Sequence, residues 1–211
     1  MSGKTYHDDL MDKGLEQVSN SANWLGGVLK MTVCAGKPAT VTEASTLFPT
    51  GKRVSDEISI TAGNVSLGAR AGGGREVTLV AKSGTVGVNV PALDSGTATA
   101  GSATTLTDTG KAWSTNAFAG KVARITGGTG AGQVGYIASN TATVLTFSNT
   151  LGTALNATSI YEVREDLHIA IYDGSGSPRL LVVNEETGDQ VLTSGNPVNI
   201  PEQKFGFAPP A

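Results

Sequence analysis

Short runs in which apolar and polar residues alternate, separated by glycine, asparagine, serine and proline, dominate this chain of 211 residues. The run at residues 166–174 is the clearest, with Leu167, Ile169 and Ile171 on one side. A period of two residues is typical of a half-buried β-strand. Comparable runs predict further strands at residues 28–36, 56–60, 76–84, 85–93, 178–186 and, in two pieces, 191–207. The glycine-rich stretch 66–76 is expected to be a solvated hairpin loop.

The first 27 residues have a different period. Thr5 and Asp8 have the spacing of a capping box, and Gly26-Gly27 is typical of a helix end. Between them, five apolar residues recur at steps of three or four: Met11, Leu15, Val18, Ala22 and Leu25. Because such steps place side chains on one face of an α-helix, we expect one helix here, preceded by a loose arm. A shorter helical turn is expected at residues 42–48.

Residues 95–163 are expected to form a separate small β domain. Five of these 69 residues are charged, and Thr, Ala, Gly and Ser dominate. Ser95-Gly96 has the composition of an exposed hairpin tip, where an added domain does least damage. Residues 1–94 and 164–211 would then form a host domain of 142 residues. The predicted fold is mainly β: a host domain like a β-sandwich or barrel with one N-terminal helix, and a small all-β domain inserted in a hairpin loop.

The sequence GGTGAGQ at residues 127–133 has the glycine spacing of a phosphate-binding loop. A P-loop places Lys and then Ser or Thr directly after its last glycine, where Gln133 and Val134 stand here. No helical pattern follows to present its N-terminus to an anion. We therefore expect a β-hairpin turn in which several residues have positive φ. Arg70 and Arg75 flank three further glycines, which could form a phosphate nest, although a solvated hairpin loop explains them more simply.

Composition narrows the classes of function. The net charge is −3 and no run of Lys or Arg is present to neutralise a phosphate backbone, so nucleic acid is not an expected partner. The sequence has neither a long apolar stretch nor a signal-peptide pattern, so we expect no membrane contact and synthesis as a soluble cytoplasmic product. Cys34, the one cysteine, lies in an apolar run and is expected to be a buried structural thiol.

No residue is predicted to be catalytic, to hold a metal or to bind a cofactor. His168 lies on the polar side of its strand, and Glu185, Glu186 and Asp189 surround a turn. Paired carboxylates could hydrolyse glycosides, but a solvated hairpin tip explains these residues more simply. The sequence GSGS at residues 174–177 lacks the residue order and the following helix of a hydrolase elbow.

The host domain resembles small structural proteins of tailed bacteriophages that decorate the capsid. The resemblance is carried by VLKMTVCAGKPATVTEA, EISI, LHIAIYDGSGSPRLLVVNE and LTSGNPVNIPEQKFGF. Residues 97–147 are similar to a module of phage virion proteins, including fibre and decoration proteins. The resemblance implies a cement protein without catalytic activity. Made in the host cytoplasm, it would bind the mature capsid surface of the virion at junctions between major capsid subunits, as a homotrimer.

The expected contacts with the major capsid protein or with neighbouring copies lie in the arm, the glycine-rich loop and the tail: Ser2, Lys4, Thr5, Arg70, Arg75, Phe205 and Phe207. The inserted domain would project outward, and its Thr- and Ser-rich surface would allow weak contact with glycans. An alternative is a head- or tail-fibre subunit in which exposed Trp113, Phe118 and Tyr136 recognise host polysaccharide, although Trp113 is expected in the core. A third alternative is an enzyme that acts on envelope sugars.

Overall fold

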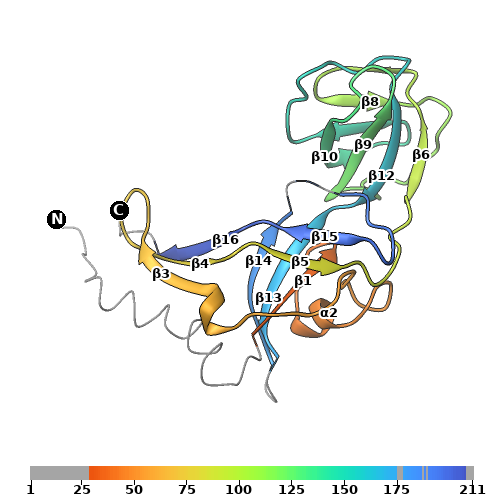
Figure 1. Ribbon diagram of the computed structural model, residues 1–211. Helices are drawn as coiled ribbons and strands as arrows, with labels where there is room; N and C mark the ends of the chain where they lie inside the picture. Colours follow the sequence, from red (N-terminus) through yellow and green to blue (C-terminus); the bar gives the residue numbers. More distant parts are fainter. Residues whose placement is uncertain (1–28, 175–177, 187, 189, 208–211) are drawn as a thin grey trace. The chain divides into compact units, whose positions relative to one another are not determined.

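The computed structural model describes residues 29–174, 178–186, 188 and 190–207. These residues contain sixteen β-strands, one α-helix and one short 3-10 turn, labelled along the chain as in Figure 1. The prediction of a mainly β fold is therefore confirmed. The predicted N-terminal helix and the arm before it lie outside the described residues.

The chain divides into two compact units. The first contains the described residues up to Asn89, His168–Glu186 and those from Leu192 onward. The second contains Val90–Leu167 and the described residues between 187 and 191. The main segment of the second unit therefore includes the whole of the predicted insert and a few residues more at each end.

A four-stranded sheet lies in the first unit, in the order β14-β13-β1-β2. Its strands are β1 (Leu29–Ala35), β2 (Ile58–Ser59), β13 (Leu167–Asp173) and β14 (Arg179–Glu185). β13 and β14 are antiparallel, with a bulge between Ile171 and Tyr172. Three of the predicted strands are thus confirmed, whereas the strand predicted at residues 56–60 is reduced to two residues.

Both faces of β13 are buried, which its alternating pattern did not predict. Ala170 and Tyr172, which lie on the predicted polar side, form a buried cluster with Cys34 and Ala44. Ala44 belongs to α2 (Val41–Ser45), which is the predicted short helical turn. The helix packs against this face and removes it from water, so residues of either side become core residues.

Two smaller sheets complete the first unit. One has the order β16-β4-β3 and the other pairs β15 with β5. Their strands are β3 (Val65–Ala69), β4 (Arg75–Leu79), β5 (Lys82–Thr85), β15 (Pro197–Ile200) and β16 (Gln203–Phe207). The single strand predicted at residues 76–84 is split, because its two halves pair in different sheets. β3 also corrects the expectation of a loop at residues 66–76.

The strand predicted at residues 85–93 is not formed. Thr85 ends β5. Val86 makes an isolated bridge with Ser55 and backbone hydrogen bonds with Gly195 and Asn196, but no strand covers residues 86–93. Val86 and Val90 are nevertheless 1% and 6% exposed. The alternation of these valines predicted their burial correctly. Buried residues without a partner strand do not, however, form a β-ladder.

The second unit is a small β-barrel with the strand order β6-β12-β9-β10-β11-β8-β7. Its strands are β6 (Asp94–Thr97), β7 (Ala100–Gly101), β8 (Thr105–Thr107), β9 (Lys121–Gly127), β10 (Val134–Asn140), β11 (Val144–Phe147) and β12 (Ile160–Glu165). Buried apolar residues from all around the sheet form one core: Ala98, Leu106, Ala123, Ile125, Ile137, Leu145, Phe147, Leu151, Leu155, Tyr161 and Val163.

The barrel is closed by a bent strand. β6 and β7 stand at opposite ends of the strand order, but only Ala98 and Thr99 separate them in the chain. Ala98 N donates to Ser159 O, next to β12, and Thr99 N donates to Thr107 O of β8. The two edges of the sheet are therefore parts of one segment, and closure leaves no open edge there.

The insert does not lie at a hairpin tip. β5, which precedes the second unit, pairs with β15, whereas β13, which follows it, pairs with β14. The flanking strands belong to different sheets, so the insert interrupts a connection between sheets. Ser95-Gly96 has the composition of a turn, but both residues lie in β6, paired with Glu162 and Tyr161 of β12.

Candidate functional site

The sheet β16-β4-β3 brings together the predicted contact residues that the structure describes. Arg75 of β4 pairs with Ala69 of β3 on one side and with Phe207 of β16 on the other. Phe205 lies two residues earlier on β16, and Arg70 directly follows β3. The glycine-rich loop and the last strand, far apart in sequence, therefore meet at one end of a single sheet (Figure 1).

The loop between β3 and β4 is a short, hydrogen-bonded turn. Arg70 N donates to Gly74 O, and Gly73 N donates to Arg70 O. Gly72, Gly73 and Gly74 all have positive φ, a conformation that other L-residues rarely adopt. The turn therefore depends on its glycines, and it holds Arg70 exposed at the end of the sheet.

This sheet has one apolar and one polar face. Side chains of directly paired residues lie on the same face. The mainly apolar face contains Val65, Leu67, Val77, Leu79 and Phe205, and the same register places Ala69, Arg75 and Gln203 on it. Of the first five, Val77 and Leu79 of the central strand are 0% exposed, whereas the other three are half-buried. The polar face contains two rows: Ser66, Thr78 and Lys204, then Gly68, Glu76 and Gly206.

Gly206 allows β16 to lie close to β4. A Cβ atom at this position would lie 2.1 Å from Arg75 O and 2.6 Å from Glu76 Cα, both backbone atoms. Any other residue would therefore push the two strands apart. The glycine between the two predicted phenylalanine contacts is a requirement of the sheet itself.

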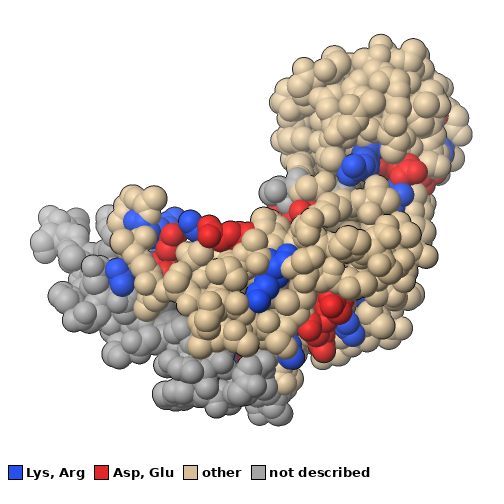
Figure 2. All heavy atoms as spheres, viewed as in Figure 1, with Lys and Arg blue, Asp and Glu red and all other residues tan. Residues whose placement is uncertain are grey.

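Charges around this sheet are few and mixed. Lys204 Nζ lies 3.0 Å from Glu202 Oε1, and its pKa is raised first by this hydrogen bond and then by the charges of Glu202 and Glu76. The pair is half exposed, so water screens it and it stabilises the fold little. Figure 2 shows a face on which basic atoms lie near acidic atoms and most of the surface carries neither.

Three predicted contacts cannot be related to this sheet. Ser2, Lys4 and Thr5 lie outside the described residues. Sequence reasoning also missed β3, because the glycines after it indicated a loop. The signal was present, since Val65 and Leu67 alternate with Ser66 and Gly68.

The glycine-rich sequence at residues 127–133 forms the loop of the β9–β10 hairpin, and Gly128, Gly130 and Gly132 have positive φ, as predicted. Four amides of the loop already have acceptors: Thr129 N donates to Thr158 Oγ1, Ala131 N to Gly128 O, Gly132 N to Ile125 O and Gln133 N to Gly130 O. A phosphate loop needs such amides to point at its ligand. Here three of them bond within the hairpin and the fourth bonds to Thr158.

Gln133, at the place of a P-loop lysine, has a structural role. Its Oε1 accepts a hydrogen bond from Thr153 N at 2.8 Å, and its Nε2 donates to Thr153 O at 3.2 Å. Asn156 Nδ2 donates to Thr129 Oγ1 at 3.1 Å. The hairpin loop is thus tied to residues 153–159 by side chains from both segments.

On the barrel, three hydrogen-bond donors surround the carboxylate of Asp94. Its Oδ2 accepts from Trp113 Nε1 at 2.6 Å, and its Oδ1 accepts from Lys111 Nζ and from Ser95 N, each at 2.7 Å. Burial alone would raise the pKa of Asp94, but the hydrogen bonds from Lys111, Trp113 and Ser95 outweigh it, and the pKa lies below its ordinary value. The carboxylate is ionised and fastens the segment that carries Trp113 to β6.

Four aromatic residues belong to the barrel core or pack on it: Trp113, Phe118, Phe147 and Tyr161. Trp113 meets Phe118 edge to face with ring centroids 5.7 Å apart, and Tyr161 in the same way at 6.4 Å. Trp113 and Phe118 are partly buried against the core cluster, which agrees with the prediction for Trp113. The Tyr161 hydroxyl donates to Asp108 Oδ2 at 2.8 Å, and burial, together with Asp108, raises the pKa of Tyr161. Tyr136 of β10 is half-buried.

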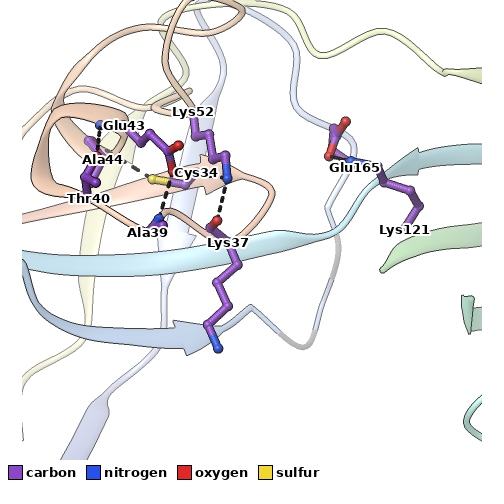
Figure 3. A network of polar contacts seen from close by, with 9 residues as sticks. All are labelled: Cys34, Lys37, Ala39, Thr40, Glu43, Ala44, Lys52, Lys121 and Glu165. Carbon is purple, nitrogen blue, oxygen red and sulfur yellow. Dashed lines mark hydrogen bonds and ion pairs between the residues drawn. The ribbon is translucent and has the colours of Figure 1, made fainter. Parts of the chain in front are cut away.

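Cys34 is fully buried beside α2, as predicted (Figure 3). Its Sγ lies 4.0 Å from Ala44 O and 3.8 Å from Thr32 Oγ1. Burial raises the pKa of the thiol to about 11, against the opposite effects of Thr32, Lys52 and Arg53. A thiol with this pKa is protonated near neutral pH, so Cys34 is not a ready nucleophile.

An ion pair fixes the chain around α2 (Figure 3). Glu43 Oε2 accepts from Ala39 N at 2.8 Å and lies 3.1 Å from Lys52 Nζ. Lys52 Nζ also donates to Lys37 O at 2.6 Å. The hydrogen bond from Ala39 and then that from Lys52 lower the pKa of Glu43. These contacts hold together the loops on both sides of the helix. Glu43 and Lys52 therefore have a structural role.

The residues considered for catalysis lie as follows. His168 of β13 pairs with Glu185 of β14, and Glu186 is 4% exposed. Asp189 lies outside the described residues. In the part of the chain that the structure describes, no group of three or more His, Cys, Asp or Glu could hold a metal ion. No helix in that part has the length and apolar character needed to cross a membrane.

Comparison with known proteins returned no match: no family model, no curated protein and no solved structure resembles the chain closely enough to count.

Proposed function

We propose that this protein decorates the outer surface of a phage capsid. It binds where major capsid subunits meet and stabilises the mature shell without catalysis, as a homotrimer on the virion. The observation that carries the proposal is the sheet β16-β4-β3. Two of its strands supply three of the contact residues expected from the sequence, Arg75, Phe205 and Phe207, and Arg75 pairs directly with Phe207.

The sheet suits a docking role. Its exposed Arg70 and its short glycine turn lie at the end of a hydrogen-bonded ladder, so little conformational entropy is lost on binding. A protein that binds only the mature lattice stabilises that lattice by mass action. Three copies that bind together gain further, because each additional contact forms at high effective concentration.

The barrel suits an outward role for the second unit in which strong adhesion is not required. Its closed sheet leaves no open edge at β6 and β7, and its Thr- and Ser-rich exterior keeps it in solution at high copy number. The fibre alternative requires aromatic side chains free to receive a sugar. Trp113 and Phe118 instead pack on the barrel core, which favours decoration over adhesion. Weak glycan contact by this unit remains part of the proposal.

The test is binding to purified phage heads that lack this protein. The unchanged protein is expected to co-sediment with mature heads and to delay their thermal disruption, with hundreds of copies per head. A handful of copies per virion, located on the tail, would instead support the fibre alternative. Shortening of host polysaccharide by the purified protein would overturn both in favour of an enzyme.

A charge reversal tests the proposed site. Arg70→Glu is expected to weaken head binding about tenfold, because one well-placed ion pair contributes about 1.4 kcal/mol. Lys37→Glu makes the same charge change at another exposed position of the first unit and is expected to bind as the unchanged protein does. Equal binding by the two variants would remove the loop from the contact.

A further inference from the structure

The sheet β16-β4-β3 has two edge strands, β3 and β16. β4 pairs with β3 on one side and with β16 on the other, and among the described strands neither β3 nor β16 has a second neighbour. An edge strand presents backbone donors and acceptors to any strand that can align with it.

Backbone hydrogen bonds identify the outward groups of β3. In an antiparallel pair, alternate residues bond to the partner strand and the others point away from it. Arg70 N donates to Gly74 O, and Val80 N donates to Asn64 O. The even-numbered residues of β3 therefore bond toward β4. The N–H and C=O groups that point away belong to Val65, Leu67 and Ala69.

The same alternation identifies the outward groups of β16. Since Glu76 and Thr78 of β4 bond toward β3, the other residues of β4 bond toward β16. Their register partners on β16 are Gln203, Phe205 and Phe207. The backbone groups of Lys204 and Gly206 therefore point away from the sheet.

The face on which each outward residue carries its side chain decides whether β3 of one copy can join β16 of another in a parallel or an antiparallel ladder. The outward residues of β3 have side chains on the apolar face, whereas those of β16 have side chains on the polar face. In an antiparallel ladder outward residues lie opposite each other, which would join an apolar face to a polar one. In a parallel ladder Leu67 lies opposite Phe205 of the partner subunit, and both faces continue.

The other described strand edges are blunted. β14 is interrupted by a bulge and ends in Arg179 and Glu185, and β2 has two residues. The small sheet β15-β5 carries Pro197 and Lys82. β3 has five residues in unbroken register, without charge, proline or bulge. Natural edge strands are usually protected by one of these devices, so β3, which has none of them and no second neighbour among the described strands, is suited to pair with another strand.

We propose that β3 of one copy pairs in parallel with β16 of the next, so that three copies close a ring. In this ring Leu67 N–H donates to the C=O of Lys204 of the partner subunit, and Leu67 C=O accepts from the N–H of Gly206 of the partner subunit. Rotation about an axis along the strands keeps β3 of one copy parallel to β16 of the next, and a closed ring uses both edges of every copy. The number of copies, and with it the choice of β16 over a second β3 as the partner edge, rests on the proposed function; the parallel direction of this pairing rests on the two edges.

Proline variants test the pairing on the purified full-length protein by light scattering coupled to gel filtration. Leu67→Pro and Lys204→Pro each remove one outward N–H and leave the ladder with β4 intact. Each is expected to convert a trimer to a monomer. Leu67→Ala and Lys204→Ala keep the amide and are the matched controls, which are expected to remain trimers. Ala69→Pro, at an exposed position of β3, replaces Leu67→Pro should that variant melt early.

Mixing the two proline variants distinguishes this pairing from a two-fold one. Leu67→Pro retains an intact β16 edge and Lys204→Pro an intact β3 edge, so their mixture is expected to form a one-to-one dimer. If Lys204→Pro dimerises alone, β3 pairs with β3 and the proposal is overturned. A monomeric unchanged protein would overturn it as well. None of these results uses heads, so head binding by the unchanged protein still judges the proposed function separately.

Discussion

At the scale of single residues, the buried thiol of Cys34 illustrates how environment sets chemistry. Its pKa of about 11 follows from burial beside Ala44 and Tyr172 in the cluster between α2 and the main sheet. The sequence predicted the burial from the apolar run around it. The size of the effect depends on the helix that covers it, which only the folded chain supplies.

This pKa predicts a loss of stability at high pH. The folded pKa lies above the ordinary 9.0, so the contribution of the thiol is present in full below about pH 9 and is lost between pH 9 and 11. Two pKa units correspond to about 3 kcal/mol. Urea unfolding at pH 8 and pH 11 should therefore show a smaller fall for Cys34→Ala than for the unchanged protein. An equal fall in both would mean that the thiol is accessible to water.

Two glycines of the β9–β10 loop form a matched pair for a stability test. Both have positive φ, but a Cβ at Gly128 would lie 1.7 Å from Thr158 O, whereas one at Gly132 would meet nothing within 4 Å. Gly132→Ala is expected to cost about 1–2 kcal/mol from its backbone conformation alone. Gly128→Ala adds a clash with fixed backbone and should cost clearly more, measured by thermal melting. Equal costs would show that residues 153–159 shift to make room for the added Cβ atom.

At the scale of elements, the β9–β10 hairpin shows why a glycine motif needs its context. The spacing of its glycines resembles that of phosphate loops, but a strand follows, and four amides of the loop already donate hydrogen bonds to acceptors within the protein. The hairpin was predictable because β-branched residues flank the glycines. The bonds of Gln133 to Thr153 were not, since they join residues across a loop of no regular pattern.

The structure of the hairpin predicts that phosphates do not bind to it and do not change the melting temperature of the protein. Adding millimolar ATP with magnesium, or inorganic phosphate at equal ionic strength, should leave the melting temperature within about 1 °C of a chloride control. Saturating a true site by a hundredfold would add about 2.7 kcal/mol, a shift of several degrees. A shift of that size, abolished by Gln133→Ala but not by Arg70→Ala, would place an anion on this loop after all.

At the scale of the whole molecule, the barrel is a compact unit whose two connections to the rest of the chain lie side by side. Leu93 N donates to Val163 O at 2.7 Å, and Arg164 Nη1 donates to Val90 O at 3.0 Å. The points where the chain enters and leaves the unit are therefore adjacent. The unit has its own core and a closed sheet, so its stability does not depend on a partner strand from elsewhere.

Excision tests this organisation. Replacing residues 90–167 by a short Gly-Ser bridge is expected to leave a folded first unit that still binds heads. The excised segment alone is expected to melt cooperatively, with Asp94→Ala lowering its melting temperature because Trp113 and Lys111 lose their acceptor. A first unit that no longer folds, or a segment without a melting transition, would contradict the division into two units.

Local patterns in the chain were enough to predict the mainly β character, the hairpin at residues 127–133, the strands around Cys34 and Ile169, and the buried thiol. These features depend on periodicity and local backbone preference, which neighbouring residues carry. Tertiary structure alone decided that residues 76–84 split between two sheets, that α2 buries the second face of β13, and that the insert joins two sheets. It also placed Arg75 beside Phe207. Strand partners are chosen by residues far apart in the chain, so no local pattern records them.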